Sequence, residues 1–315
     1  MLNMIAGSVL PITAFIGVFF AFAATCILTS FLNDWLPRDM GREFAHNGKL
    51  SAGKPRGAGI IFISVFCIAA LLFGEMSVEM FIYLVLVFVE MLTGFMDDAA
   101  DEPWGEYKKG ILDFLVAAVA ALNYIHFNST YVELATIGVK FYIPPVLFFI
   151  LTIILVWAAI NVTNCSDGVD GLSGTLTIIT LVTIYVIDQI RGNETQFPYI
   201  ILLFVVCILG YLWYNATPSR LMMGDAGSRA MGIFISLAVL KTGSPFLFLL
   251  VALGLVKVAL LRFLKIHIFA NTTMPLHDHV RKKIGWSNTQ TVFRFAIIQI
   301  VISIATVYMI LIWNK

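Results

Sequence analysis

Long apolar runs separated by short polar segments make up most of the chain. Several runs reach the roughly 18–20 residues that a helix needs to cross the hydrocarbon core of a bilayer. None shows the alternating pattern of a membrane strand, and backbone in lipid must satisfy its own hydrogen bonds. The pattern predicts ten transmembrane helices, at about 5–31, 59–73, 79–96, 111–126, 143–160, 174–190, 198–214, 228–242, 246–268 and 291–313.

Composition supports the same class. Of the 315 residues, 60% are hydrophobic and 12% are charged, whereas a soluble domain has about 45–50% apolar and about 25% charged residues. We therefore expect an all-α polytopic membrane protein that forms a single domain over residues 1–315. The net charge of +1 says nothing about nucleic acid, and no basic tract supports it, so no nucleic-acid partner is expected. The four cysteines show no paired spacing that would indicate a disulfide or a thiolate metal site.

The basic residues predict the orientation, because cytoplasmic loops of membrane proteins are enriched in Lys and Arg. With the N-terminus outside, fourteen of the twenty basic residues fall in cytoplasmic connections. These are Arg38, Arg42, Lys49, Lys54, Arg56, Lys108, Lys109, Arg220, Arg229, Arg262, Lys265, Arg281, Lys282 and Lys283. The outer side has four, namely Lys140, Arg191, Lys241 and Lys315. Both termini are expected to be extracytoplasmic.

The polar, glycine-rich and aspartate-bearing segments all fall on the cytoplasmic side in this orientation. They are KPRGAG (54–59), GFMDDAADEPWGEYKKG (94–110), NVTNCSDGVDGLSG (161–174), YNATPSRLMMGDAGS (214–228) and MPLHDHVRKKIGWSNTQ (274–290). The outer loops, such as FGEMSVE and KTGSP, are short and carry few polar groups. The sequence thus predicts an active site on the cytoplasmic face.

Carboxylates in these loops indicate a hard metal ion. Asp97 and Asp98 are adjacent, so on a helix their side chains would point about 100° apart. Asp225 stands between glycines that would let a ligand approach the backbone closely. Oxygen ligands without thiolates suit Mg²⁺ or Mn²⁺, and Mg²⁺ commonly binds one or two carboxylates together with substrate phosphates. The alternative is that each aspartate only ends a helix in water.

The amide and carboxylate side chains of the third loop have helical spacing. Asn161, Asn164 and Asp167 are three residues apart and would share one helical face, and Asp170 follows at the same interval. Together with the aspartates of the other loops, they make a convergent polar site a better interpretation than a set of unrelated helix ends.

Several cations and imidazoles are candidates for binding phosphate. Lys54 and Lys109 would suit phosphate or diphosphate, although each could also act only as a topogenic charge. His277 and His279 flank Asp278, so that zinc is conceivable but phosphate binding is favoured.

Two ionisable residues within predicted spans are further candidates. Glu90 and Lys257 either form part of the site or merely pair or snorkel.

Taken together, the loops resemble those of the polyprenyl-phosphate N-acetylhexosamine-1-phosphate transferase superfamily, from about Lys54 to Phe295. GFMDD resembles its Asp-Asp motif, NCSDGVDGLSG its Asn-x-x-Asp-Gly-x-Asp-Gly-Leu loop, and MMGDAGS its Phe-Met-Gly-Asp-x-Gly-Ser motif. PLHDH followed by GWSNTQTVFRF is most similar to the branch that transfers phospho-N-acetylmuramoyl-pentapeptide. Two features depart from that branch: Asp278 replaces the middle residue of a His-His-His run, and KPRGAG stands where a Thr-Met-Gly-Gly stretch is usual.

The resemblance implies a multi-pass enzyme of the bacterial plasma membrane that makes lipid I and UMP from UDP-N-acetylmuramoyl-pentapeptide and undecaprenyl phosphate, with Mg²⁺ required. It implies that Asp225 binds the metal, that Asp97 and Asp98 lie near the lipid phosphate and the diphosphate, and that Asp97 is the candidate base. His277 is counted with these catalytic residues. The residues implied to bind substrate are Lys54, Lys109, Asn161, Asn164, Asp167, Asp170, Asn215, Met222 and His279.

Two alternatives to this function are considered. A related transferase that uses UDP-N-acetylglucosamine is the nearest, because the KPRGAG loop leaves the sugar specificity open. A cation or sugar transporter would use charges within the spans, but transporters often carry paired internal repeats, and none is visible here. Membrane lipid is an expected partner in every case, and a homodimer is left open.

Overall fold

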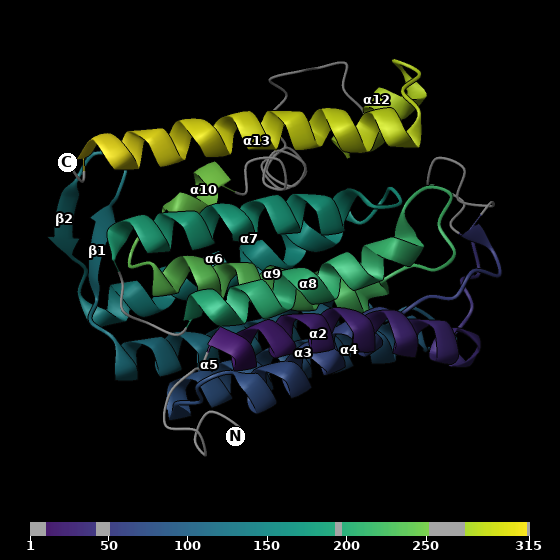
Figure 1. Cartoon of the computed structure of the whole chain (residues 1–315), viewed down its shortest axis with the longest axis horizontal. Coiled ribbons are helices and arrows are strands. Elements are labelled where there is room, and N and C mark those ends of the chain that lie inside the picture. Colours follow the sequence, from purple (N-terminus) through teal and green to yellow (C-terminus); the bar gives the residue numbers. More distant parts are fainter. Residues whose placement is uncertain (1–10, 42–50, 193–196, 252–274, 314–315) are drawn as a thin grey trace.

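The computed structural model of the chain describes residues 11–41, 51–192, 197–251 and 275–313. It is a bundle of long helices that run side by side (Figure 1). The helices are α2 (Pro11–Leu32), α3 (Gly59–Phe73), α4 (Val78–Asp98), α5 (Glu106–Phe127), α6 (Pro145–Ser166), α7 (Leu172–Arg191), α8 (Phe197–Asn215), α9 (Gly224–Lys241), α10 (Leu247–Val251), α12 (Leu276–Lys282) and α13 (Asn288–Trp313). A short 3₁₀ turn (Asn33–Trp35) follows α2, and two strands, β1 (Tyr131–Leu134) and β2 (Val139–Tyr142), join α5 to α6.

Seven of the described helices are long and apolar enough to cross a membrane, which confirms a multi-pass helical membrane protein. They are α2, α4, α5, α6, α7, α8 and α13, while α3 is apolar but shorter. Of the ninth predicted segment, 246–268, only α10 is described, and Lys257 lies outside the described residues. The full count of ten spans and the orientation of the termini stay predictions.

Helix α9 is the buried centre of the bundle. Every residue from Gly224 to Leu240 is buried, and α9 packs against α3, α4, α6 and α7. Small residues make this possible, because they let helix backbones approach closely without a side chain between them. A Cβ at Gly59 would collide with the backbone of Gly227, and one at Gly94 would lie 2.5 Å from the backbone carbonyl of Asp225. Glycines on α3 and α4 thus set the position of the start of α9.

One end of the bundle carries an antiparallel hairpin that the sequence pattern did not predict. Strand β1 pairs with β2 from Tyr131 opposite Tyr142 to Leu134 opposite Val139. Each strand has four residues, too short for the alternation to stand out. The polar loops and α12 lie at the opposite end of the bundle (Figure 1).

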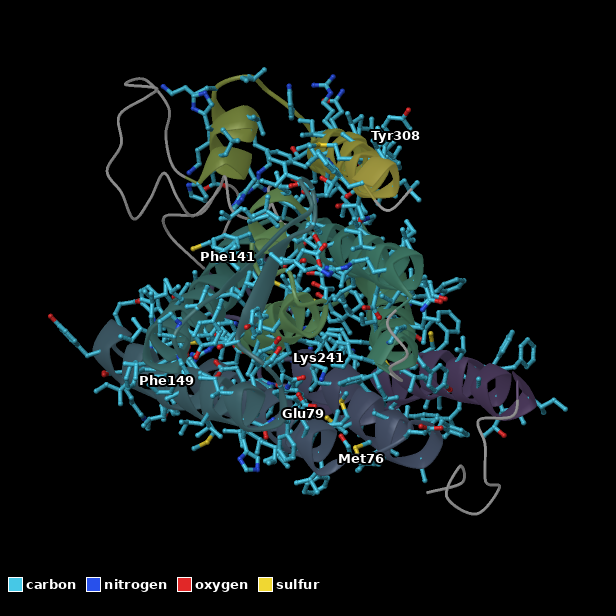
Figure 2. All side chains as sticks on the ribbon, turned by 90° about the vertical axis from the view of Figure 1, so that its left-hand side faces the viewer. Met76, Glu79, Phe141, Phe149, Lys241 and Tyr308 are labelled. Atoms are coloured by element: carbon cyan, nitrogen blue, oxygen red, sulfur yellow. The ribbon has the colours of Figure 1, made fainter. Side chains whose placement is uncertain are left out.

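The hairpin end of the bundle, although its loops carry few polar groups, is joined by ion pairs and hydrogen bonds. At the hairpin end, Lys241 Nζ lies 3.0 Å from Glu79 Oε2 and donates to Asn128 Oδ1 at 3.0 Å. Figure 2 shows Glu79 and Lys241 side by side on this face. Arg191 pairs with Glu133 at 2.6 Å, and a cavity of about 480 Å³ lies between the two groups. Partly buried ion pairs therefore join α4 to α9 and β1 to α7 at this end.

We predict that Gly94→Leu lowers stability, because the new side chain must push α4 away from α9. Overpacking of this kind costs about 1–3 kcal/mol of unfolding free energy. Gly110→Ala on α5 is the matched control, since a Cβ there meets no heavy atom within 4 Å, and alanine favours the helix by about 0.5–1 kcal/mol. Thermal unfolding of both variants in detergent measures the difference. Equal midpoints would contradict the close packing of α4 on α9.

Candidate active site

The carboxylates singled out in two separate loops meet where α4 ends and α9 begins. Asp97 and Asp98 are the last two residues of α4, and Asp225 is the second residue of α9. Gly224 has φ +67°, and a Cβ there would collide with the carboxylate of Asp98. Only glycine fits this turn without strain, because other residues rarely adopt positive φ. The glycine before Asp225 therefore brings Asp225 against the end of α4.

Asp98 is bound on all sides by protein groups. Its carboxylate accepts the backbone N–H groups of Asp225 and Ala226, each at 3.1 Å, and lies 2.8 Å from Arg56 Nε. The first N–H groups of a helix have no partner within the helix and favour a negative charge. Asp98 thus supplies acceptors to the start of α9 from a side chain that is fully buried.

Asp97 points to a different set of partners, as the expected divergence of adjacent side chains requires. Its Oδ2 lies 2.5 Å from Lys109 Nζ, and its Oδ1 accepts the backbone N–H of Trp104 at 2.6 Å. The second contact orders the loop between α4 and α5. Asp97 therefore faces Lys109 at the start of α5.

Two cations hold Asp225. Lys109 Nζ lies 3.2 Å from Oδ2, and Arg56 Nη2 lies 3.4 Å from Oδ1. Burial lowers the pKa of Arg56, but the carboxylates of Asp98, Asp225 and Asp39 raise the pKa above its ordinary value overall, so the guanidinium is permanently charged. Lys109 and Arg56 each bridge two of the three aspartates, so this cluster of carboxylates is partly neutralised by shared cations.

A cavity of about 250 Å³ opens beside Asp225. Asn161 and Asn164 reach it from α6. Asn161 donates to Asp113 Oδ2 at 3.4 Å, and Asn164 donates to Ser228 Oγ at 3.0 Å. The cavity is lined by Glu106, Lys109, Gly110, Asp113, Trp157, Ile160, Asn161, Asn164, Asp225 and Arg229. The structure thus brings Lys109, Asn161, Asn164 and Asp225 to one cavity.

The side-chain amide of Asn215 binds backbone groups of two loops. It accepts the N–H of Gly171 at 2.8 Å and donates to the carbonyl of Leu221 at 2.8 Å. The backbone of Met222 pairs with Pro55 and Ala58. The side chain of Asn215 and the backbone of Met222 therefore hold loops together.

Ser219 joins two further predicted residues to the same set of loops. Asp170 accepts a hydrogen bond from the backbone N–H of Ser219 at 3.4 Å. Lys54 donates to the hydroxyl of Ser219 at 3.0 Å. Asp167 lies close enough to Arg56 to raise its pKa, which places the third loop next to the carboxylate cluster.

Helix α12 docks on the third loop. A Cβ at Gly168 would collide with the ring of His277, and Arg281 donates to the carbonyl of Gly168 at 3.0 Å. His277 is buried, and burial lowers its pKa from 6.5 to about 4 even though Asp278 opposes the shift. In the described part of the chain His277 has no hydrogen bond or ion pair with the aspartates of α4 and α9. The structure places it against Gly168, beside the Asp167–Asp170 segment.

The zinc alternative finds no support at α12. Asp278 is held by Arg281 at 2.5 Å and by Lys282 at 3.3 Å, and its pKa is lowered because these contacts outweigh burial, which raises it. Among the residues that the structure describes, no group of three or more His, Cys, Asp or Glu side chains, the three aspartates included, is arranged so that it could hold a metal ion by itself. A binding site for Mg²⁺ with one carboxylate and substrate phosphates needs no such group, and the donor set beside Asp225 fits that mode.

Two site residues were missed by the sequence analysis. Asp113 lies within a predicted span, so the rule that singled out Glu90 would also have found it. Arg229 was counted as a loop charge, but it is buried within α9, where its Nε lies 2.8 Å from Glu90 Oε1 and its Nη2 pairs with Asp113. For Glu90, the pairing interpretation was the right one.

Comparisons with known proteins agree with these motifs. The profile described as glycosyl transferase family 4 matches residues 80–243. The phospho-N-acetylmuramoyl-pentapeptide-transferase of Treponema pallidum (strain Nichols) is 39% identical, over 84% of this chain and 80% of the relative. Proteins of the same name from Nitratiruptor sp. and Symbiobacterium thermophilum are 26% and 29% identical, over 93% and 80% of this chain and 92% and 81% of their own lengths.

We predict that stability falls in acid because His277 is buried in its neutral form. Between pH 6.5 and about 4 the unfolded chain binds a proton that the folded chain does not, so stability rises with pH across this window. The shift corresponds to roughly 3 kcal/mol, lost as pH falls from 6.5 to 4. The difference between the thermal midpoints at pH 7 and pH 4.5 should therefore be smaller in His277→Asn than in the wild type. His126→Asn, at an exposed position, is the control; the same pH dependence in all three proteins would contradict the assignment.

Proposed function

The chain belongs to glycosyl transferase family 4, and from this membership we propose that it transfers phospho-N-acetylmuramoyl-pentapeptide from its UDP derivative to undecaprenyl phosphate. The products are lipid I and UMP, made at the cytoplasmic face of the bacterial plasma membrane during peptidoglycan synthesis. The observation that carries the proposal is the meeting of Asp97, Asp98 and Asp225 with Lys109 and Arg56 beside a cavity, at one end of a membrane bundle. Two anionic substrates need such shared cations when their phosphates approach.

We propose Mg²⁺ as the cofactor, held by Asp225 together with substrate phosphates. When bound, the ion would supply positive charge for the diphosphate and orient it. Asp225 suits this role because it borders the cavity at the start of α9. Lys109 and Arg56 already contact its two oxygens, so the same cations can turn to substrate phosphates when a metal takes the carboxylate.

The chemistry is one displacement at phosphorus. An oxygen of the lipid phosphate forms a bond to the phosphorus attached to the sugar, and the bond from that phosphorus to the oxygen of UMP breaks. Any proton on the attacking phosphate goes to Asp97, and UMP leaves with the electron pair of the broken bond. Lys109 and Arg56 offset the negative charge that builds on the transferring group.

Asp97 suits the proton-accepting role better than Asp98. The carboxylate of Asp98 is committed to two backbone N–H groups and to Arg56. Asp97 instead contacts Lys109, a mobile point charge that can move to a substrate phosphate and free a carboxylate oxygen. We therefore assign the proton to Asp97 and the positioning of α9 to Asp98.

A two-step route through a phospho-carboxylate intermediate is the rival mechanism. In that route, labelled UMP would exchange into the UDP-sugar without any lipid acceptor. We expect no exchange in the absence of undecaprenyl phosphate, and rapid exchange would overturn direct attack.

The class of reaction is tested with the purified protein and Mg²⁺. We expect release of UMP when UDP-N-acetylmuramoyl-pentapeptide and undecaprenyl phosphate are both present. UDP-N-acetylglucosamine is assayed side by side, because the alternative transferase would prefer it. Absence of UMP release from either sugar nucleotide would reject the proposed function.

Aspartate variants test the assigned roles. Asp225→Asn and Asp97→Asn should each lower kcat by about 10²–10⁴-fold, since they remove the metal ligand and the base. Asp101→Asn, at an exposed position in the neighbouring loop, should keep kcat within about twofold of wild type. A variant of Asp97 that retains the wild-type rate would remove it from the mechanism.

A further inference from the structure

A buried ionic network lies one step away from the carboxylate cluster. Arg229 on α9 pairs with Glu90 on α4 through Nε at 2.8 Å and with Asp113 on α5 through Nη2. Asp113 also accepts a hydrogen bond from Asn161 on α6 at 3.4 Å. All three charged side chains are almost wholly buried. The guanidinium thus joins α9 to α4 and α5, and Asn161 attaches α6 to the network through Asp113.

Each of three helices in this network also carries a residue of the proposed site. Asp97 is seven residues beyond Glu90 on α4, which is about 10 Å along the helix axis. Lys109 is four residues before Asp113 on α5, and Asp225 is four residues before Arg229 on α9, each about 6 Å along the axis. The site residues therefore project from helices that are tied to each other one or two turns below them.

Glu90 acts on the site only through its partners. It is fully buried and is not among the residues that line the cavity beside Asp225, whereas Arg229 and Asp113 are. Its second oxygen, Oε2, is buried without a hydrogen-bond partner among the described residues. No substrate can reach Glu90, so its effect on chemistry has to pass through Arg229.

Stability alone does not account for three buried charges. Desolvating them is expensive, and apolar side chains of similar volume often stabilise a fold as well or better. The guanidinium differs from apolar packing in that its planar fork fixes the direction of two carboxylates at once. Such an arrangement fixes how far α4, α5 and α9 are shifted along one another, whereas apolar packing would only keep them in contact.

We propose that Arg229, held by Glu90 and Asp113, is a positioning residue that fixes Asp225 relative to Asp97 and Lys109. The catalytic consequence rests on the proposed transferase function, whereas the structural consequence does not. When the network is broken, α9 can shift along α4, and the contacts between Asp98 and the N–H groups of Asp225 and Ala226 loosen.

The first test compares the buried Glu90–Arg229 pair with the partly buried Glu79–Lys241 pair at the other end of the bundle. Glu90→Gln removes the charge but keeps the size, and Arg229→Lys keeps the charge but loses the fork. We expect Glu90→Gln to lower kcat about 10-fold and Arg229→Lys about 10–100-fold, with KM for the UDP-sugar changed by less than about twofold. Glu79→Gln, at the hairpin end, is the matched control and should lower the thermal midpoint while kcat stays near wild type. Wild-type kcat in Glu90→Gln, or equal losses of kcat in Glu90→Gln and Glu79→Gln, would overturn the proposal.

A second variant covers the case in which Glu90→Gln does not fold. Glu90→Leu, Asp113→Leu and Arg229→Met together leave no uncompensated charge, and such replacements usually preserve folding. This triple variant should reach the thermal midpoint of the wild type or exceed it, with kcat lowered at least about 10-fold. Full activity in a stable triple variant would show that the network only holds the fold.

Hydrogen exchange supplies a readout that does not depend on turnover. The amides of Asp225 and Ala226 bind Asp98, so their exchange reports how α9 sits on α4. Mass spectrometry of peptides over 221–230 should show exchange at least about fivefold faster in Glu90→Gln and unchanged in Glu79→Gln. If the wild type transfers no phosphosugar but this difference appears, the proposed function fails and the positioning role stands. Unchanged exchange in Glu90→Gln would overturn the positioning role whatever the activity.

Discussion

The start of α9 rests on the carboxylate of Asp98, and the geometry of the site follows from that contact. Two backbone N–H groups, of Asp225 and Ala226, have no partner within their own helix and donate to Asp98 instead. The contact requires the backbones of α4 and α9 to be very close, which Gly94 and Gly224 allow. Asp225 is therefore placed by its own backbone, and its side chain points to Arg56 and Lys109 rather than to Asp98.

Close approach of like charges has to be compensated, and shared cations do this in two places. Near the helix ends, Arg56 and Lys109 each touch two aspartates. Deeper in the bundle, Arg229 touches Glu90 and Asp113. The first pair of cations is close to solvent and can exchange partners, whereas Arg229 is enclosed and fixed. Because of this difference in burial, Arg56 and Lys109 are accessible to a substrate, whereas Arg229 holds the helices in place.

The two ends of the bundle use charge differently. At the hairpin end, Lys241 and Arg191 lie near the last turns of α9 and α7, where cations complement the helix dipole, and each has a carboxylate partner. At the opposite end, four carboxylates share two cations, Arg56 and Lys109; the carboxylates are those of Asp39, Asp97, Asp98 and Asp225. The Mg²⁺ ion and the phosphate-bearing substrates that we propose would bind at this end.

Most of the helices could be predicted from the sequence, because few kinds of structure can span a bilayer. Apolar length alone predicted the described helices from α2 to α9 and α13 to within a few residues, since helices satisfy their own backbone in lipid. The motifs also indicated which polar residues gather at one end, including Asp97, Asp98 and Asp225. Even the divergence of Asp97 from Asp98 followed from helix geometry.

What the tertiary structure decided is which of these groups touch. Partners such as Arg56 with Asp98, or Arg229 with Glu90, are 42 and 139 positions apart, and spacing along the chain carries no information on pairs so distant. The hairpin was missed because four-residue strands give no clear alternation. Arg229 stands at the start of the predicted span 228–242 and was counted with the loop charges, because the sequence does not tell how deep a charge at a helix end is buried. Only the packing of α9 against its neighbours determines which charges are enclosed, because burial depends on close contacts between helices that no local pattern records.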